Sequence, residues 1–599
     1  MSASRIKTST KSISRRQDTF FPLNRCDLEE RGWDECDFIF VSGDAYVDHP
    51  SFAAALLCRM LEANGYKTGI IPQPDWKESS SYTVLGKPRL GFLIGAGSMD
   101  SMVAHYTAAK RKRSDDAYSP GGKSGQRPDR ATLVYTEGIK RTYKNTPVII
   151  GGIEASLRRL AHYDYWSDKI RRSILLDSKA DILVYGMGER PLLQIADRLA
   201  AGEAIGNICD VRGTCVRAGK SALESRKDIV FLPGYEAVKE RDEKSLRAYA
   251  EHYLLQKQNT DPLSAKTLIE ENDGDRWIIQ NPPALPLSSK ELDKLYELPF
   301  TRKAHPVYGK EGINALKEVS FSLISSRGCF GGCSFCAITN HQGRAVTGRS
   351  RESLVREARS LTVMPGFKGY IHDTGGPTAN FFRPSCEKQK HGGFCTQREC
   401  LYPSPCPELK ADHKAYIQAL KALREIPGIK KVFIRSGIRF DFIQYDKKYG
   451  NEFLETLCRH HVSGQLKVAP EHVSANVLDA MGKCRKNTGD EDSCYEQFKK
   501  DFTAVNRRLG LKQYLLPYYI CAHPGAGRKE AEELAQYLKK TGFTPEQTQE
   551  FYPTPGTLST VMYYTGFDPR TYNKVSGTMK PIFTARSDKE RRMQKDMLK

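Results

Sequence analysis

The 599-residue sequence predicts an α/β protein in two parts, a Rossmann-like doubly wound parallel sheet and then a partial (β/α)6 barrel of the TIM-like kind. Two observations predict this fold class. Short apolar runs alternate with amphipathic helical patterns between residues 36 and 200, and the same alternation restarts at Glu318. Strands that alternate with helices form βαβ units, which build parallel sheets covered by their helices.

The first part, residues 18–210, contains five strand candidates that we expect to form the doubly wound sheet. They are Cys36–Gly43, Gly69–Pro72, Leu90–Ile94, Val148–Ile153 and Asp181–Tyr185. In such sheets a ligand binds beyond the carboxyl ends of the strands. Glycines stand at these ends, and they mark the edge where a cofactor would bind: Gly43, Gly95, Gly97, Gly151 and Gly186.

Residues 211–315 have a less regular pattern and are interpreted as a bridging region that contains the charged helix Ser245–Gln256. The barrel is expected over residues 316–568. Its strand candidates are Val319–Ser325, Phe367–Asp373, Lys431–Gly437, Gln465–Ala469, Gln513–Ile520 and Gln547–Phe551. A basic segment at each end, residues 1–17 and 569–599, completes the chain, and the first is expected to be flexible.

Composition excludes a membrane-spanning protein and favours a reducing compartment. No stretch approaches the ~18 uninterrupted apolar residues that a membrane helix needs. Lys and Arg number 92 against 71 Asp and Glu, and the resulting net charge of +21 permits an anionic partner without requiring one. Sixteen cysteines are too dilute for a disulfide scaffold, and the sequence begins without a secretory signal, so we expect a cytoplasmic protein.

Three cysteines follow the first barrel strand at a spacing that suits a metal centre. Cys329, Cys333 and Cys336 form a C-x3-C-x2-C pattern within the glycine-rich segment Arg327–Cys336. Three protein ligands leave one metal position open, which is typical of catalytic metal sites. A zinc site with a distant fourth ligand is the structural alternative.

Four more cysteines lie in a predicted insertion, residues 384–410, after the second barrel strand. They are Cys386, Cys395, Cys400 and Cys406. Four thiols in one short loop favour metal, but their irregular spacing leaves three interpretations open. These are a second iron–sulfur cluster, a zinc site and loop thiols without metal.

The first motif, with the aromatic Phe335 before its last cysteine, resembles that of the radical S-adenosylmethionine (SAM) superfamily. Other segments make the chain resemble the YgiQ-type radical SAM proteins over roughly residues 18–595. They are Gly43–Pro50, Pro147–Ser156, His162–Ser167 and Ala469–His472. The resemblance implies a Rossmann-like domain followed by a radical SAM barrel, and it supplies no substrate.

The same resemblance implies one [4Fe–4S] cluster, held by Cys329, Cys333 and Cys336, with SAM on the fourth iron. An electron passed into SAM would cleave a C–S bond and yield a 5′-deoxyadenosyl radical, which abstracts hydrogen from a substrate. That substrate is an unidentified small molecule or RNA, and a reducing partner such as flavodoxin or ferredoxin is implied.

Further residues at the strand ends are implied to contact SAM. They are Phe335, Gly375, Gly376, Ser436, Arg439, Lys467 and Glu471. Where members of the superfamily place a Gly-Gly-Glu turn, this chain has Pro377 in place of the acid, so the two glycines are expected to act only through their backbone. The turn Tyr552–Thr557 resembles the P-G-T turn of tRNA-methylthiolating enzymes, which makes nucleic acid a candidate substrate.

Two alternatives stay open. The first part also resembles the module of cobalamin-binding radical SAM enzymes, but the D-x-H-x-x-G pattern is missing because Asp48 and His49 are adjacent. Cobalamin could still bind without a histidine ligand. The chain as a whole could instead be a non-catalytic iron–sulfur or zinc protein that binds RNA through its basic surface.

Overall fold

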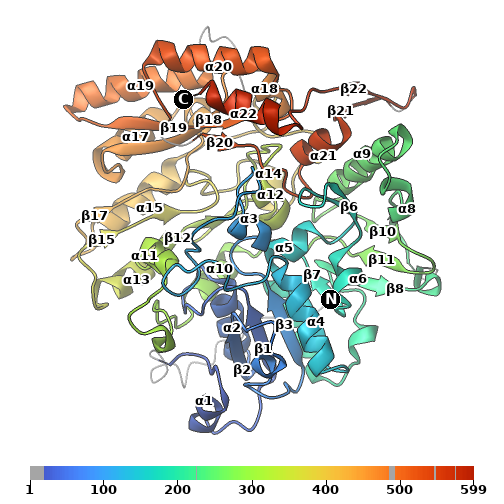
Figure 1. Cartoon of the computed structure of the whole chain (residues 1–599). Coiled ribbons are helices and arrows are strands. Elements are labelled where there is room, and N and C mark those ends of the chain that lie inside the picture. Colours follow the sequence, from blue (N-terminus) through green and yellow to red (C-terminus); the bar gives the residue numbers. More distant parts are fainter. Residues whose placement is uncertain (1–18, 224–225, 484–492, 546–547, 574, 599) are drawn as a thin grey trace. The chain divides into compact units, whose positions relative to one another are not determined.

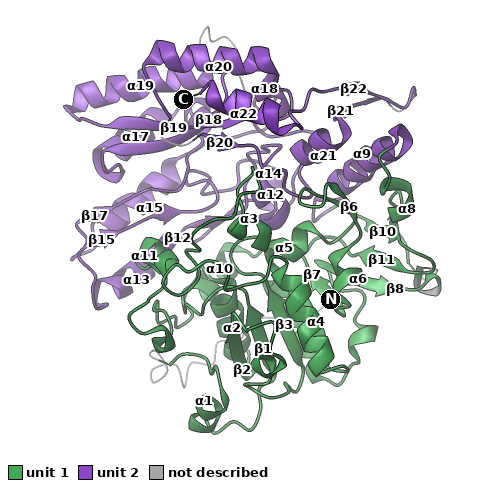
Figure 2. Cartoon of the chain, viewed as in Figure 1, with its two compact units in different colours: residues 1–241, 264–320 green, residues 242–263, 321–599 purple. Residues whose placement is uncertain are grey.

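The computed structural model describes residues 19–223, 226–483, 493–545, 548–573 and 575–598, and it divides into two compact units (Figures 1 and 2). Unit 1 comprises residues 1–241 and 264–320, and unit 2 comprises residues 242–263 and 321–599. The basic segment 1–17, expected to be flexible, lies outside the described residues.

A nine-stranded sheet forms the centre of unit 1, in the order β2-β1-β3-β4-β7-β8-β11-β10-β9. Its strands are β1 (Phe38–Ser42), β2 (Thr68–Pro72), β3 (Gly91–Gly95), β4 (Val148–Gly151), β7 (Ile182–Val184), β8 (Thr214–Ala218), β9 (Ile229–Phe231), β10 (Thr267–Glu271) and β11 (Trp277–Gln280). The first five strands in this order are parallel, which confirms the predicted doubly wound sheet. Every residue of β1 and β3 is buried, as expected where helices cover both faces.

The helices of unit 1 are short. They are α1 (Arg25–Glu30), α2 (Ala53–Ala63), α3 (Ser101–His105), α4 (Ala131–Thr142), α5 (Gly152–Leu157), α6 (Ile174–Ser178), α7 (Glu189–Ala200), α8 (Tyr235–Val238), α10 (Ser289–Tyr296) and α11 (Asn314–Val319). A small hairpin, β5 (His162–Asp164) with β6 (Lys169–Arg171), completes the unit.

Four strands of this sheet, β8 to β11, fall in the region that the sequence analysis left as an irregular bridge. β8 runs antiparallel to β7 and β11, and β10 forms an antiparallel hairpin with β11. The turn between β10 and β11 contains Asp273-Gly274, a dipeptide that favours hairpins and could have revealed it. The helix predicted at Ser245–Gln256 is present as α9 (Glu243–Gln258), and it belongs to unit 2.

Unit 2 contains six parallel strand segments that follow one another in chain order, which confirms the predicted partial barrel. The strands of this unit are β12 (Leu323–Ile324), β13 (Ser326–Arg327), β14 (Thr347–Gly348), β15 (Tyr370–Ile371), β16 (Thr374–Gly375), β17 (Lys431–Val432), β18 (Gln465–Glu471), β19 (Tyr514–Cys521), β20 (Gln549–Glu550), β21 (Phe567–Asn573) and β22 (Thr578–Pro581). β12 pairs with β16, β15 with β17, and β18 with β19 and then β20, all in parallel. A parallel bridge between Ile438 and Val468 connects the third segment to the fourth.

Helices separate these strand segments. They are α12 (Ala337–Gln342), α13 (Arg351–Thr362), α14 (Glu387–Lys390), α15 (Lys414–Arg424), α16 (Phe440–Tyr445), α17 (Gly450–Thr456), α18 (Ala475–Ala480), α19 (Cys494–Leu509), α20 (Arg528–Thr541), α21 (Leu558–Thr565) and α22 (Asp588–Asp596). The first barrel strand starts at Leu323 and not at Val319, because Asn314–Val319 form α11. The predicted start of the sixth strand, Gln547, lies outside the described residues.

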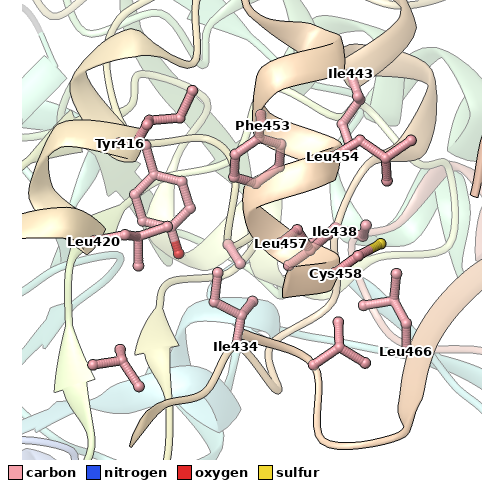
Figure 3. Close-up of a cluster of buried hydrophobic side chains, with 14 of the residues drawn as sticks. Tyr416, Leu420, Ile434, Ile438, Ile443, Phe453, Leu454, Leu457, Cys458 and Leu466 are labelled. Carbon is pink, nitrogen blue, oxygen red and sulfur yellow. The ribbon is translucent and has the colours of Figure 1, made fainter. Parts of the chain in front are cut away.

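A large hydrophobic cluster holds the helices of unit 2 against the strands (Figure 3). Tyr416 and Leu420 of α15 face Phe453 and Leu457 across it, and Leu466 of β18 lies at its edge. The hydroxyl of Tyr416 donates a hydrogen bond to the carbonyl oxygen of Thr374 at 2.5 Å. The core therefore reaches the turn that follows the second barrel strand.

None of the helices formed by the described residues is long and apolar enough to cross a membrane.

Candidate active site

The loop that carries Cys329, Cys333 and Cys336 follows β13 and is fixed by hydrogen bonds at several points. The amide of Cys329 donates to the carbonyl oxygen of Gly343 at 3.0 Å. The amide of Ser334 donates to Met481 at 2.9 Å, and the carbonyl oxygen of Ser334 accepts from Ser559 at 3.0 Å. These contacts tie the loop to segments that follow the first, fourth and sixth barrel strands.

The three thiols of this loop are neighbours. Burial raises the pKa of Cys329 and that of Cys336, the latter to about 12, and the nearby Cys333 raises both further. The Sγ of Cys329 lies 3.4 Å from the hydroxyl of Thr378. Thiols that oppose one another's ionisation become stable as thiolates when a cation lies between them.

The donor set fits a multinuclear cluster better than a single ion. Among the described residues, no three His, Cys, Asp or Glu side chains are arranged to hold one metal ion. A zinc ion would need its sulfur ligands about 2.3 Å from one common point. In an iron–sulfur cluster each cysteine binds a different iron, so three neighbouring but spread thiols with one position open suit a [4Fe–4S] cluster.

Arg439, predicted to contact SAM, points at the cysteine loop. It is buried and forms two parallel hydrogen bonds to the carboxylate of Asp441, at 2.9 and 2.5 Å. Its remaining nitrogen, Nη1, donates to the carbonyl oxygen of Gly331 at 3.2 Å and to the Sγ of Cys333 at 3.5 Å. Burial alone would raise the pKa of Asp441, but the guanidinium of Arg439 holds it below its usual range. The sequence analysis missed Asp441, which orients this arginine.

The predicted glycine turn and Ser436 lie together. The Asp373 carboxylate accepts hydrogen bonds from the amides of Arg435 and Ser436, at 2.8 and 3.1 Å, and from the hydroxyl of Ser436. A β-carbon on Gly375 would lie 2.7 Å from the Oγ of Ser436, and one on Gly376 would lie 2.6 Å from the carbonyl oxygen of Ser326. Both glycines are therefore required by close packing, whatever else they contact.

Glu471 ends β18 in an unusual backbone conformation. Its φ of 68° lies in the left-handed region, which costs a non-glycine residue about 1 kcal/mol or more and is concentrated at functional sites. Burial raises the pKa of its carboxyl, which lies 3.7 Å from the Nζ of Lys483. Lys483 itself donates to the carbonyl oxygen of Ala469 at 2.5 Å, and it too was missed from the sequence. Lys467, by contrast, is exposed and makes no hydrogen bond or ion pair with the other candidates in the described part of the chain.

A cavity of about 370 Å³ lies beside these groups, within unit 2. Its lining includes Arg439, Asp441, His472 and Lys483. The size is that of a pocket for a small organic molecule. Arg439 and Asp441 in its lining are paired with each other.

Phe335 and the Tyr552–Thr557 turn each make a contact beside the cysteine loop. The Phe335 ring stands edge-on to the ring of His523, with 5.9 Å between centroids. The side-chain amide of Asn340 donates to the carbonyl oxygen of Gly556 at 2.6 Å. The turn that resembled a nucleic-acid-related motif thus packs on the helix that follows Cys336.

In unit 1, charged side chains fill the space beyond β1 and β3, where the sequence analysis placed a cofactor edge. Arg127 is fully buried and pairs with Asp44 at 2.9 Å and with Asp116 at 2.8 Å. A β-carbon on Gly43 would lie 2.0 Å from the carbonyl oxygen of Ala96, so this glycine serves close backbone packing.

Asp48 and His49, the adjacent pair considered for cobalamin, are both buried in structural contacts. Asp48 pairs with Arg59 at 2.6 Å and accepts from the amide of Thr301 at 2.9 Å. The Nε2 of His49 lies 3.0 Å from the Nη1 of Arg302, and burial lowers the pKa of His49 well below its usual value. A neutral His49 can accept this hydrogen bond.

Comparison with known proteins identifies the family of this chain. The family described as Radical SAM N-terminal matches residues 20–322, and a domain of unknown function, DUF3362, matches residues 546–599. A UPF0313 protein of Clostridium botulinum (strain 657 / Type Ba4) is 51% identical over 580 residues, which are 97% of this chain and 87% of the relative. A UPF0313 protein of Clostridium perfringens (strain 13 / Type A) is 49% identical over 583 residues, with 97% and 85% covered.

Among solved structures, this chain is similar to the radical SAM methyltransferase TsrM from Kitasatospora setae with cobalamin and a [4Fe–4S] cluster bound. The identity is 13% and the TM-score 0.48, with 87% of this chain and 74% of that chain covered. The cobalamin-dependent radical SAM enzyme OxsB, with aqua-cobalamin bound, matches at 11% identity and a TM-score of 0.46, with 89% and 56% covered.

Proposed function

Because the chain belongs to the UPF0313 family and its residues 20–322 match the family described as Radical SAM N-terminal, it is a radical SAM enzyme, and we propose that Cys329, Cys333 and Cys336 bind its [4Fe–4S] cluster. We propose further that the barrel binds SAM beside this cluster. The observation that carries the proposal is the loop itself: three neighbouring thiols at the carboxyl ends of barrel strands, next to a tightly packed glycine turn.

The cluster and SAM, when bound, supply one-electron cleavage of SAM to a 5′-deoxyadenosyl radical that abstracts hydrogen from the substrate. The chain's own residues prepare the site for this chemistry. Arg439 donates to the Sγ of Cys333, and Asp441 keeps the guanidinium aimed at it. The hydroxyl of Thr378 lies 3.4 Å from the Sγ of Cys329, and this contact lowers the pKa of Cys329 against the larger effect of burial.

The remaining candidates complete the proposed SAM site. Gly375 and Gly376 offer their backbone, Phe335 belongs to the cysteine loop, Ser436 follows the third barrel strand, and Lys467 and Glu471 belong to β18. The substrate class stays open between a small molecule and RNA. An electron donor such as flavodoxin or ferredoxin, in the cytoplasm, would supply the reducing electron.

One assay decides between this proposal and a non-catalytic RNA-binding protein. Anaerobically reconstituted protein with dithionite and SAM is expected to form 5′-deoxyadenosine, measured by liquid chromatography and mass spectrometry. The matched control is the same protein reconstituted without iron. Salt-sensitive RNA binding with no 5′-deoxyadenosine above that control would contradict the proposed enzyme and support the RNA-binding protein.

The Arg439–Asp441 pair gives a second expected result. Replacing Asp441 by Asn leaves a buried guanidinium without its counter-charge, so unfolding in urea should become easier by about 3 kcal/mol. The variant should also lose iron faster to a chelator, because Arg439 no longer holds Gly331 and Cys333.

The control for this prediction is Glu532→Gln, which removes an exposed ion pair with Arg528 on α20 and should cost about 0.4 kcal/mol at most. Wild-type stability and iron retention in Asp441→Asn would show that the pair does not organise the cysteine loop.

A further inference from the structure

The cavity of about 370 Å³ in unit 2 is lined by residues from the strand ends and from the helices outside them. Arg439 and His472, which follow the third and fourth barrel strands, form one part of its lining. Glu533 and Tyr537 of α20 form another part. Because Arg439 also donates to the Sγ of Cys333, the cavity lies one side chain away from the cysteine loop.

The charges around this cavity leave one carboxylate without a partner. Three cations that line the cavity, or pair with a residue that lines it, each have a carboxylate as partner. They are Arg439 with Asp441 at 2.5 Å, Lys483 with Glu471 at 3.7 Å and Lys499 with Glu496 at 3.2 Å. The carboxylate of Glu533 is exposed and makes no hydrogen bond or ion pair with another described residue. The unpaired charge of the described lining is therefore negative.

His472 adds a hydrogen-bond donor that has no partner. Its Nδ1 accepts a hydrogen bond from the amide of Ser474 at 3.0 Å, so the ring proton is on Nε2. The residue is 3% exposed, and burial lowers its pKa to about 4, which keeps the ring neutral at physiological pH. Within the described part of the chain, Nε2 donates to no other group. An acceptor atom of a bound ligand would satisfy this donor.

Aromatic rings form the apolar part of the lining. The rings of Phe440 and Tyr495 pack on each other, with 5.6 Å between centroids. Tyr537 is held in place because its hydroxyl donates to the carboxylate of Glu496 and accepts from the Nζ of Lys499 at 3.1 Å. Rings fixed in this way offer a preformed surface to an apolar group, and their faces also attract cations.

From these three features we propose that the cavity binds a small organic amine that carries an oxygen acceptor and an apolar or aromatic body. Its ammonium group pairs with Glu533, its oxygen accepts from the Nε2 of His472, and its body packs on Phe440 and Tyr495. Of the residues proposed to contact SAM, only Arg439 lines this cavity, so the two sites are distinct. RNA fits less well, because the described lining offers a phosphate no unpaired cation. The proposal concerns binding alone and does not depend on a cluster.

The test compares three probes that share a phenyl ring and a hydroxyl group and differ in charge. They are phenylethanolamine, a cation, its neutral isostere 1-phenylpropan-1-ol, and the anion mandelate. Each is titrated into full-length protein, reconstituted anaerobically and kept without reductant, and binding is followed by ligand-observed NMR. We expect phenylethanolamine to bind about fivefold more tightly than the neutral isostere, and mandelate to bind most weakly.

Two variants assign this preference to the named groups. Glu533→Gln should remove the preference for the cation, whereas the control Glu532→Gln, at the adjacent position of α20, should keep it because Glu532 pairs with Arg528 outside the lining. His472→Asn keeps an acceptor for the amide of Ser474 but lacks Nε2. It should weaken phenylethanolamine binding about fivefold and leave phenethylamine, which has no hydroxyl group, unaffected.

Several outcomes would overturn the proposal: no binding, equal affinity for the three probes, tighter binding of mandelate, or displacement of phenylethanolamine by SAM. Formation of 5′-deoxyadenosine is measured separately, with reductant. Protein that forms this product without preferring the amine contradicts the present inference alone. Protein that prefers the amine but forms no product contradicts the proposed function alone.

Discussion

Alanine in place of Cys329, Cys333 or Cys336 is expected to abolish 5′-deoxyadenosine formation and the visible sulfur-to-iron absorbance of the proposed cluster. In the proposed site each thiol binds a different iron, and this loop contains no other cysteine to replace it. The absorbance is measured after anaerobic reconstitution, and the product by mass spectrometry. A second iron–sulfur cluster at the cysteines of residues 384–410 would leave residual absorbance, so product formation is the decisive measurement.

The matched control is Cys26→Ala, which removes an exposed cysteine of α1 and should change neither measurement. Full product formation by any one of the three loop variants would show that its cysteine is not a ligand.

The second large effect is expected at the glycine turn. Gly376→Ala would push its new β-carbon against the backbone oxygen of Ser326, which lies three residues before Cys329 and cannot move without shifting the cysteine loop. Overpacking of this kind costs about 1–3 kcal/mol. We expect SAM affinity, measured by calorimetry on reconstituted protein, to fall by about tenfold or more.

The clash expected in Gly375→Ala involves a side chain and not the backbone. Its β-carbon would meet the side chain of Ser436, so the added substitution Ser436→Gly should relieve the clash and restore part of the protein's thermal stability. The same second substitution should not rescue Gly376→Ala. Unchanged SAM affinity and stability in both single variants would show that the turn has no role in SAM binding and only connects a strand to a helix.

Much of the fold could be predicted because the βα alternation is a local pattern. Apolar runs at Gln465–Ala469 and Gln513–Ile520 correspond to β18 and β19 almost residue for residue. The strands β8 to β11 were missed, since strands of three to five residues carry little periodicity of their own. Their pairing depends on neighbours far away in the chain.

The candidate site could likewise be predicted only in part. Spacing alone brought out the C-x3-C-x2-C loop and the insertion, because ligand sets of this kind are close in sequence. Asp441 and Lys483 were not predicted, because the role of each depends on an ion pair formed in the folded protein. Asp441 pairs with Arg439, and Lys483 pairs with Glu471. A charged residue has no sequence signature that names its partner.

The buried trio of Arg127, Asp44 and Asp116 constrains how this lineage can change. Loss of Arg127 leaves two carboxylates in the interior without their counter-charge, at a cost of about 3–5 kcal/mol that a domain of ordinary stability can hardly absorb. A descendant that loses this arginine must therefore replace both carboxylates as well, or fold poorly. Arg127 is expected to be inherited together with Asp44 and Asp116.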